Sequence, residues 1–254
     1  MKKHWKKIVM AVVCLALIVV AGSFIYAKFI NKADEEFDSS DVKDRLTTTI
    51  APEITGGSDA TSPDATTPVA TEPSGTTATA GGVDGEWLIA GGSEVGYRVD
   101  ESINGFDTTA NGRTQAITGA FTIDGTAVSS GSFTVDMTTF KSDESRRDGQ
   151  FNGRIMAVDQ FPTATFALTA PIDFQQVPTD GSTITATATG DLTLRGTTVS
   201  VTFEVEATFA NGRVGVLGKI PVVFADYGIP NPSVATITTE DNGLLEFVLI
   251  FDRA

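Results

Sequence analysis

The side chains best suited to acid–base chemistry form one charged run in the second half of the chain. Asp143, Glu144 and Asp148 supply three carboxylates there, and Arg146 and Arg147 lie between them. Carboxylates this close together could coordinate Ca²⁺ or act as a general acid and base. Their spacing does not fit an EF-hand loop, and the two arginines would neutralise the acids. We therefore interpret the run as a salt-bridged loop that leads into a helix.

Other residue types that commonly act in catalysis or bind metals are scarce. The chain has one histidine and one cysteine, His4 and Cys14, and both lie close to its N-terminus. The rest of the sequence therefore lacks the residues for a Ser-His-Asp triad or a cysteine nucleophile, and for zinc, copper or haem ligation. Asp226 and Tyr227 could form a site, but a turn that ends a strand explains them more simply. We predict no catalytic residue, no metal site and no enzymatic activity.

The first 27 residues have the pattern of a membrane anchor. Residues 2–7 are basic, whereas residues 8–27 carry no charge. A helix of this length rises about 30 Å, which is the thickness of the hydrocarbon core of a bilayer. A cleaved secretory signal is the alternative, but its apolar core usually has only about 7–15 residues. We expect a single-pass transmembrane helix over 8–27 in the cell membrane, with residues 1–7 as a cytoplasmic tail and the rest extracytoplasmic.

Residues 28–83 do not have the composition of a folded domain. The part from 46 to 82 is rich in threonine, contains four prolines and has few large apolar side chains. Such a segment cannot bury enough apolar surface to offset the entropy lost on ordering it. A charged stretch at 31–45 could continue the anchor helix. We predict that 28–83 is a disordered linker.

The net charge of −14 limits the partners of the chain. Phosphate contacts select lysine and arginine, so no nucleic-acid partner is expected. An acidic surface would also be repelled by anionic lipid headgroups. Contact with lipid should therefore occur in an interior cavity rather than by adsorption to the surface of the domain. The sequence leaves self-association into a homodimer open.

Residues 84–254 alternate apolar and polar side chains, which is typical of strands with one buried face. The clearest stripes lie at 95–99, 117–123, 199–205 and 245–251. Some stretches, including 247–250 within the last stripe, are apolar on both faces. Turn residues separate the stripes, and no long helical pattern interrupts them. The segment is therefore predicted to be an all-β domain.

The connections between the strands favour a barrel over a sandwich. About eight strands are joined by short hairpin-like loops, of which Asn211-Gly212 is the strongest turn signal. A closed barrel pairs sequential strands and leaves no edge exposed. The alternation breaks at 143–156, where Phe151, Ile155 and Met156 predict a short amphipathic helix. We predict an eight-stranded antiparallel barrel with a short helical insertion.

Several short motifs follow one another along this domain. They are Trp87-Leu88-Ile89, Ser93-x-Val95-x-Tyr97-x-Val99, Thr118-Gly119-x-Phe121, Phe133-x-Val135-x-Met137, Arg147-Asp148, the F-P-T-A-T-F run from Phe161 to Phe166, the G-D-L-T-L-R-G run from Gly190 to Gly196, and Asp226-Tyr227-Gly228-Ile229. In this order they resemble the YceI-like family of secreted lipid-binding proteins, over about residues 85–253. The resemblance implies a lipocalin-like barrel that holds a polyisoprenoid or another long-chain amphiphile in an apolar lumen.

A functional hypothesis follows from the resemblance and from the sixteen phenylalanines of the chain. A barrel interior lined with large apolar side chains can hold one elongated ligand, such as a polyprenol, an isoprenoid quinone or a fatty chain. This lipid would be the only bound group, and no other cofactor is expected. The candidate lumen residues are Phe133, Val135, Phe151, Ile155, Met156, Phe166, Leu168, Leu192, Leu194, Val201 and Phe203.

Two other functions remain open at this point. The first is a structural or stress-response surface protein whose barrel is filled by its own side chains. The second is an enzyme that uses Asp148 or Asp226 as an acid or base on a lipid-like substrate. The preferred hypothesis is a membrane-tethered extracytoplasmic protein that sequesters a long-chain ligand.

Overall fold

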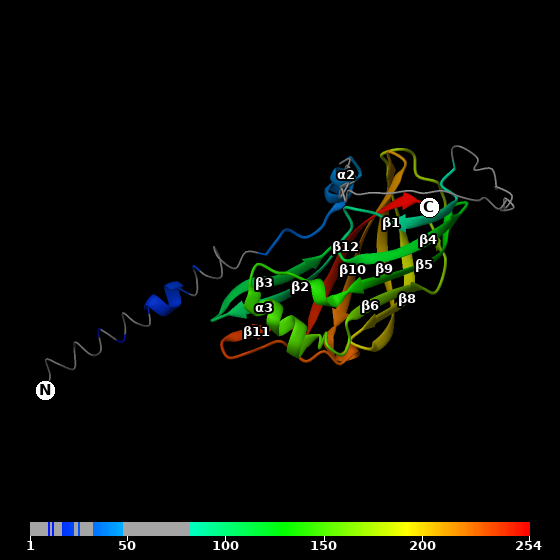
Figure 1. The fold of residues 1–254 in the computed structure, drawn as a ribbon. Coiled ribbons are helices and arrows are strands. Elements are labelled where there is room, and N and C mark those ends of the chain that lie inside the picture. Colours follow the sequence, from blue (N-terminus) through cyan, green and yellow to red (C-terminus); the bar gives the residue numbers. More distant parts are fainter. Residues whose placement is uncertain (1–9, 11, 13–16, 23–24, 26–32, 48–81) are drawn as a thin grey trace, which may run out of the picture.

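The computed structural model describes residues 10, 12, 17–22, 25, 33–47 and 82–254 (Figure 1). The strands are β1 (Gly85–Ile89), β2 (Glu94–Ile103), β3 (Phe106–Thr114), β4 (Ile117–Asp124), β5 (Ala127–Asp136), β6 (Thr163–Leu168), β7 (Ile172–Asp173), β8 (Thr183–Leu194), β9 (Thr197–Ala210), β10 (Arg213–Val223), β11 (Ile237–Thr239) and β12 (Asn242–Arg253). The helical elements are α2 (Ser39–Thr47), α3 (Ser145–Gln150), the π-helical turn η3 (Phe151–Ile155) and the 3-10 turns η2 (Met137–Thr139) and η4 (Phe224–Tyr227).

The strands form one antiparallel sheet that closes on itself. Around the ring the order is β1, β4, β5, β6, β8, β9, β10 and β12, and β12 pairs back with β1. Strand β2 continues β1 after a break at 90–93, and β3 leads directly into β4. The hairpin β2–β3 is paired from Val95↔Thr114 to Ile103↔Phe106 and extends beyond the ring, where β11 joins the edge of β2. The predicted eight-stranded antiparallel barrel with a short helical insertion is therefore confirmed.

The two ends of the barrel differ in what covers them. At one end, which we call the helix end, lie α3, η3, η4 and the β2–β3 turn at Asn104-Gly105. At the other, the turn end, lie the β4–β5 turn at Gly125, the β9–β10 turn at Asn211-Gly212 and the last residues of β12. In Figure 1 the helix end is on the left, and the C-terminus marks the turn end on the right.

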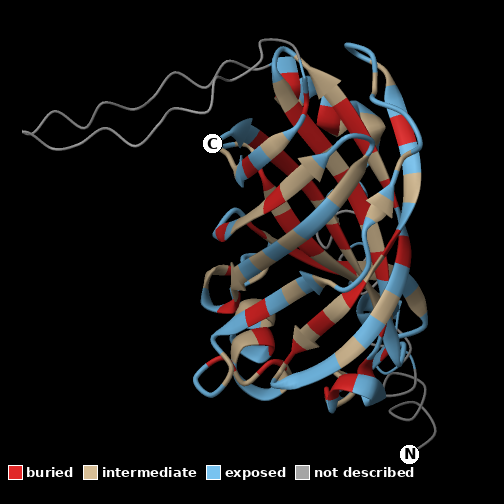
Figure 2. Cartoon of the chain, turned by 90° about the vertical axis from the view of Figure 1, so that its right-hand side faces the viewer, coloured by how far each residue is buried: buried red, intermediate tan, exposed pale blue. Residues whose placement is uncertain are grey.

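The alternation of side chains along the strands explains how the barrel is held together. In β8, Ile184 and Ala188 are buried, and Thr185 and Thr187 between them are exposed. Figure 2 shows the same change of burial from residue to residue on neighbouring strands. Because successive side chains of a strand point to opposite faces, one apolar set fills the interior and one polar set meets the solvent.

The segment before the barrel differs from the prediction. Residues 28–83 were expected to be a disordered linker, but residues 34–47 lie on the outer wall of the barrel and include α2, which contacts β9, β10 and β12. Phe37, Val42 and Leu46 from this segment are almost completely buried. We call residues 34–47 the strap. Its burial of three large apolar side chains is the physical reason that it is ordered.

The remaining expectations for the N-terminal region lie largely outside the described residues. Residues 1–7 are not described, nor is most of 8–27, and the same holds for 48–81 of the predicted linker. Within 8–27, residues 17–22 are helical, and Leu17 and Ile18 are exposed. No helix within the described ranges is long and apolar enough to cross a membrane.

Candidate functional site

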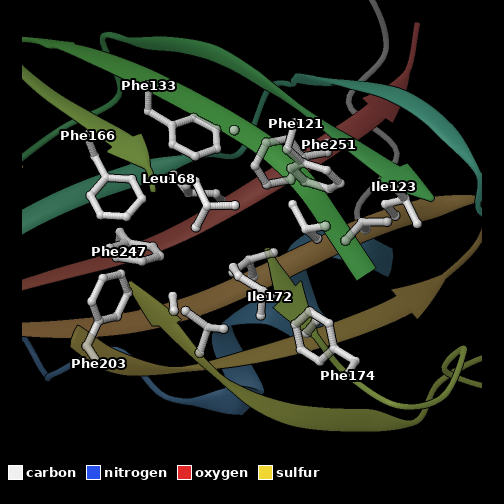
Figure 3. A pocket seen from close by; sticks show the side chains of 18 of the residues that line it. Phe121, Ile123, Phe133, Phe166, Leu168, Ile172, Phe174, Phe203, Phe247 and Phe251 are labelled. Carbon is white, nitrogen blue, oxygen red and sulfur yellow. The ribbon is translucent and has the colours of Figure 1, made fainter. Parts of the chain in front are cut away.

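The interior of the barrel contains an apolar cavity of about 160 Å³ toward the turn end. Figure 3 shows Phe121, Phe133, Phe166, Phe203 and Phe251 pointing into it from strands on several sides of the barrel. Their rings are in contact: the centroids of Phe121 and Phe251 are 4.4 Å apart, and those of Phe166 and Phe203 are 5.7 Å apart. No charged side chain of the described residues lines this inner cavity. Apolar walls of this kind favour hydrocarbon over water.

A second, larger cavity of about 540 Å³, which we call the outer cavity, lies toward the helix end of the lumen. Its walls combine apolar side chains of β2, η3 and η4 with charged groups that include Glu101 and Arg147. Val95, Val135, Ala164 and Leu245 line both cavities, so the outer cavity adjoins the inner one along the barrel. The lumen therefore changes from purely apolar to amphipathic toward the helix end.

An aromatic cluster forms one wall of the outer cavity. The ring of Tyr97 stacks on Phe151, with centroids 4.6 Å apart and planes within 8° of parallel, and Phe140 packs against both. Gly112 on β3 faces Tyr97, and a Cβ at Gly112 would meet the tyrosine ring at 2.6 Å. The missing side chain therefore makes room for the ring.

The hydroxyl of Tyr97 stays protonated over a wide pH range. Burial raises the pKa of Tyr97 far above its usual value, and the positive charge of Arg147 offsets only part of this effect. A neutral hydroxyl can donate and accept one hydrogen bond. It therefore supplies the outer cavity with a polar group that suits an uncharged or an anionic partner.

The charged run at 143–148 forms the start of α3, as predicted from its composition. Glu144 caps the helix by accepting a hydrogen bond from the N–H of Arg146. Arg147 pairs with Asp143 and lies 3.8 Å from Glu101 on β2. Asp148 accepts hydrogen bonds from Ser142. These contacts tie α3 to the rim of the barrel, where Arg147 and Glu101 line the outer cavity.

The structure places the predicted lumen residues along both cavities. Those that line the inner cavity are Phe133, Val135, Phe166, Leu168, Leu192 and Phe203, and those that line the outer cavity are Val135, Phe151, Ile155, Met156 and Leu194. Val201 packs against the core but lines neither cavity. Residues that the prediction omitted include Tyr97, Leu245, Phe247 and Phe251. Their alternation was visible in the sequence, but it did not show which stripe faces the lumen.

Of the carboxylates considered for acid–base chemistry, Glu144 lines the outer cavity, whereas Asp148 and Asp226 do not reach the lumen. Asp148 is held by Ser142 and Lys141, and Asp226 is exposed on η4. Neither residue lines either cavity. Within the described ranges, no three His, Cys, Asp or Glu side chains come close enough together to hold a metal ion.

Three sequence motifs meet at the helix end. The guanidinium of Arg195 lies 6.0 Å from the ring of Phe161 and donates a hydrogen bond to the carbonyl of Gly228. Gly196 has φ +75°, and a Cβ there would meet Phe161 at 2.6 Å. The F-P-T-A-T-F, G-D-L-T-L-R-G and D-Y-G-I motifs therefore join the β8–β9 turn, the start of β6 and η4.

The comparison with known families agrees with the order of these motifs along the chain. Residues 88–251 match the YceI-like domain. The chain belongs to the YceI-like family. No curated protein sequence matches the chain. The family match extends from β1 into β12 and so includes the whole ring of the barrel.

Two solved structures share the fold of this YceI-like chain. One is a polyisoprenoid binding domain from Saccharophagus degradans that is implicated in plant cell wall breakdown; it has a TM-score of 0.55 and 15% identity, and the match covers 67% of this chain and 99% of that one. The other is BcnA from Burkholderia cenocepacia, with a TM-score of 0.50 and 20% identity, where the match covers 62% of this chain and 95% of that one. At these identities the likeness concerns the fold.

Proposed function

We propose that this YceI-like protein is a membrane-tethered, extracytoplasmic binding protein that holds one long-chain apolar ligand in the barrel lumen. The observation that carries the proposal is the change along the lumen from a phenylalanine-lined inner cavity to an amphipathic outer cavity. A polyisoprenoid or an isoprenoid quinone has the same change of polarity along its length. The Saccharophagus degradans domain of the same fold, described as polyisoprenoid binding, supports this class of ligand.

The size of the cavities determines how such a ligand would lie. An apolar cavity of about 150 Å³ holds a molecule the size of benzene, so the inner cavity takes only the end of a long tail. The outer cavity has the volume of an ordinary ligand pocket, roughly 300–1,000 Å³. The tail would therefore extend through both cavities, and the polar head would lie at the helix end near Tyr97 and Arg147.

Burial of the tail supplies the affinity. Each CH₂ removed from water contributes about 0.8 kcal/mol, so a tail of several isoprene units needs few polar contacts. The rim of the outer cavity carries polar groups on the side chains of Tyr97, Glu101 and Arg147. These groups would orient the head group and keep it at the mouth of the lumen.

The membrane tether is the second part of the proposal. Residues 8–27 are uncharged over the length of a bilayer-spanning helix, and lysines precede them. The acidic surface of the domain opposes adsorption to anionic lipid, so a tether would keep the domain close to the bilayer that supplies its ligand. A homodimer stays a prediction from the sequence.

The alternatives are less consistent with the structure. A barrel filled by its own side chains does not agree with two interior cavities. An enzyme that uses Asp148 or Asp226 would need at least one of these carboxylates in the lumen, and neither lines it. We therefore propose binding without a catalytic step.

Comparative lipid analysis of the full-length protein tests the proposal. Ala164 lines both cavities, so Ala164→Leu would narrow the passage between them, whereas Ala167 on the same strand is exposed and Ala167→Leu is the matched control. The full chain would be extracted from its membrane with a polymer that keeps its lipids, and these would be identified by mass spectrometry. We expect a long-chain isoprenoid or fatty lipid that is enriched with the wild type and Ala167→Leu and depleted with Ala164→Leu. Identical lipid profiles for all three would contradict the proposal.

A further inference from the structure

The strap is attached to the barrel through a carboxylate that is completely buried. Glu246 on β12 points to the outer wall and is 0% exposed. Its Oε2 accepts a hydrogen bond of 3.0 Å from the N–H of Phe37 in the strap, and its Oε1 lies 3.2 Å from Arg113 and 3.6 Å from Arg98. A buried carboxylate is tolerated only when such partners satisfy it. The strap therefore supplies part of the site that Glu246 requires.

The side chain of Phe37 completes this attachment. The guanidinium of Arg113 lies 3.9 Å from the centre of the Phe37 ring, and that of Arg45 lies 5.0 Å from it. A cation over an aromatic face is attracted by the ring, more strongly when both are shielded from water. Phe37 is only 1% exposed. Its ring thus packs beneath two arginines, one from the barrel and one from the strap.

Specific contacts also hold α2, the helix of the strap, against the outer wall of the barrel. Asp38 accepts hydrogen bonds from the hydroxyl and the N–H of Ser40, which hold the pKa of Asp38 below its usual value and satisfy the start of α2. Val42 and Leu46, four residues apart on one face of α2, pack over Gly215 of β10. Arg45 donates a hydrogen bond of 2.7 Å to Glu94 of β2.

The direction of the strap is fixed by its contacts. Asp34, at its beginning, accepts hydrogen bonds from Arg98 and Asn111 on the β2–β3 hairpin that extends to the helix end. Leu46, near its end, accepts a hydrogen bond from Asn211 in the β9–β10 turn, at the turn end. The strap therefore runs from the helix end to the turn end. In Figure 1 the blue segment that leads into α2 approaches from the side of β2 and β3.

In the sequence, the N-terminal apolar stretch of residues 8–27 lies shortly before the start of the strap, which is at the helix end. Only residues 28–33 separate that stretch from the strap, and six residues span at most about 20 Å when fully extended. By contrast, the described residues on both sides of 48–81 lie at the turn end, since Arg213 donates to the carbonyl of Arg45 and Arg253 donates to that of Gly82. Residues 48–81 therefore connect two points on the barrel and do not set its distance from the membrane.

We propose that the strap holds the helix end of the barrel against the bilayer that carries residues 8–27, so that lipid passes directly between this bilayer and the outer cavity. The rim of the helix end exposes two apolar side chains, Val223 at 48% and Val234 at 40%. The turn end exposes Val177 to the same extent as Val223, so the path of the strap carries the orientation. This inference rests on the proposed tether and lipid binding, and adds to them an orientation and a route.

The orientation is tested with two matched fluorescent labels on the full chain. Cys14→Ser removes the native thiol, and Val223→Cys or Val177→Cys then supplies one at the helix end or at the turn end. Both valines are 48% exposed, so the labels have similar access to solvent. The proteins would be placed in phosphatidylcholine nanodiscs that contain a lipid with a nitroxide on its headgroup, which quenches a nearby fluorophore.

We expect quenching at position 223 to be at least about three-fold stronger than at position 177. The fourteen residues of β9 run from one end of the barrel to the other, and at a strand tilt of about 40° they separate the ends by roughly 35 Å, beyond the reach of a headgroup nitroxide. Equal quenching at both positions, or stronger quenching at 177, would overturn the orientation.

A strap variant shows whether the orientation depends on docking. In Gly215→Val the added side chain would collide with Val42 and displace α2, whereas Gly153→Ala adds a Cβ that meets no atom within 4 Å. We expect Gly215→Val to equalise the quenching at the two positions and Gly153→Ala to leave it unequal. If the strap is released in Gly215→Val and position 223 is still quenched more strongly than position 177, something other than the strap sets the orientation. That result would contradict the inference.

The lipid analysis tests the proposed function, and the quenching measurement tests the orientation. If the long-chain lipid copurifies but the two labels are quenched equally, lipid binding stands and the orientation is wrong. If the labels differ as expected but no lipid copurifies, the orientation stands and the binding function is wrong.

Discussion

Glu246 on β12 and Arg113 on β3 form an ion pair of 3.2 Å on the outer wall of the barrel, although Glu246 has no exposed surface. The strap closes this site, because the N–H of Phe37 donates to Glu246 and the Phe37 ring packs against the guanidinium of Arg113. The pair therefore links three parts of the chain that are far apart in sequence, and its stability should depend on the strap.

Glu246→Gln should destabilise the fold. The substitution keeps the shape and one hydrogen-bond acceptor but removes the negative charge that Arg98 and Arg113 share. Breaking a buried ion pair typically costs about 3–5 kcal/mol, and the partial exposure of both arginines reduces this to about 2 kcal/mol. The free energy of unfolding in urea measures it. Glu240→Gln, an exposed residue shortly before β12, is the control and should change stability by less than about 0.5 kcal/mol. Equal stability of the two variants would contradict the role assigned to Glu246.

Gly215→Val should release the strap without unfolding the barrel. The new side chain occupies the space of Val42 and Leu46 on the outer wall, whereas the lumen lies on the other face of β10. Trypsin cleaves after Lys43 and Arg45, and a docked helix resists cleavage. We expect cleavage at these sites to become at least about tenfold faster, which corresponds to a loss of about 1.4 kcal/mol of docking free energy.

The matched glycine variant tests whether this effect is specific. Gly153→Ala should leave the cleavage rate at Lys43 and Arg45 unchanged, because its Cβ meets open space. Circular dichroism should show the same β-sheet signal for both variants. Unchanged protection of the strap in Gly215→Val would mean that the contact over Gly215 does not hold it.

The sequence contains one signal for the strap, which lies in β12. Leu245, Phe247 and Leu249 face inward in the predicted stripe, but Val248 and Ile250 on the opposite face are also apolar, and both are 0% exposed. A strand that is apolar on both faces needs cover on its outer side. The strap, however, offers only a few apolar side chains, and its partner Glu246 is 209 positions from Phe37. Composition alone could not pair two segments so far apart.

The sequence predicts the barrel but does not predict which residues line each of its two cavities. The reason is physical. Period-two alternation assigns residues to one of two faces of a strand, and Phe133, Phe166 and Phe203 lie on the face that lines the inner cavity. Alternation does not give the position of a residue along the barrel axis. Val201 faces the same side as Phe203 and packs in the core, yet it lines neither cavity. The cavities depend on how rings from opposite strands interlock.

Stability should decrease above about pH 10 because of Tyr97. An unfolded tyrosine ionises near pH 10, whereas burial raises the pKa of Tyr97 in the folded state well above that value. Below pH 10 both states are protonated, and the stabilisation from this residue is fully present. Above pH 10 the unfolded chain loses its proton first, so the free energy of unfolding falls by up to about 1.4 kcal/mol per pH unit.

Urea unfolding at a series of pH values from 8 to 11 measures this fall, and Tyr97→Phe is the matched variant. The phenylalanine keeps the stack on Phe151 but cannot ionise, so its stability should fall less steeply above pH 10. Some decrease should remain, since burial also raises the pKa of Tyr227. Parallel curves for the wild type and Tyr97→Phe would show that Tyr97 ionises as easily in the folded state as in the unfolded one.

Affinity should rise with the length of the ligand tail until both cavities are filled. Each added isoprene unit buries five more carbons, and at about 0.8 kcal/mol per CH₂ even partial burial should lower Kd by about tenfold per unit. Trp87 provides the readout, because it is buried and stacks on Phe121, which lines the inner cavity. In the full chain with Trp5→Phe, energy transfer from Trp87 to a fluorescent prenol would report binding, and unlabelled prenols of increasing length would compete.

In Ala164→Leu, the affinity should stop rising at a shorter tail length than in the wild type. Ala164 lines both cavities, so a larger side chain there would confine the tail to the outer cavity and remove the gain from the inner one. Short prenols should then bind nearly as well as they do to the wild type, whereas long ones should lose at least about tenfold in affinity. Ala167→Leu, on the exposed face of β6, should behave as the wild type. If Ala164→Leu reduced the affinity for all tail lengths equally, the tail would not extend from the outer cavity into the inner one.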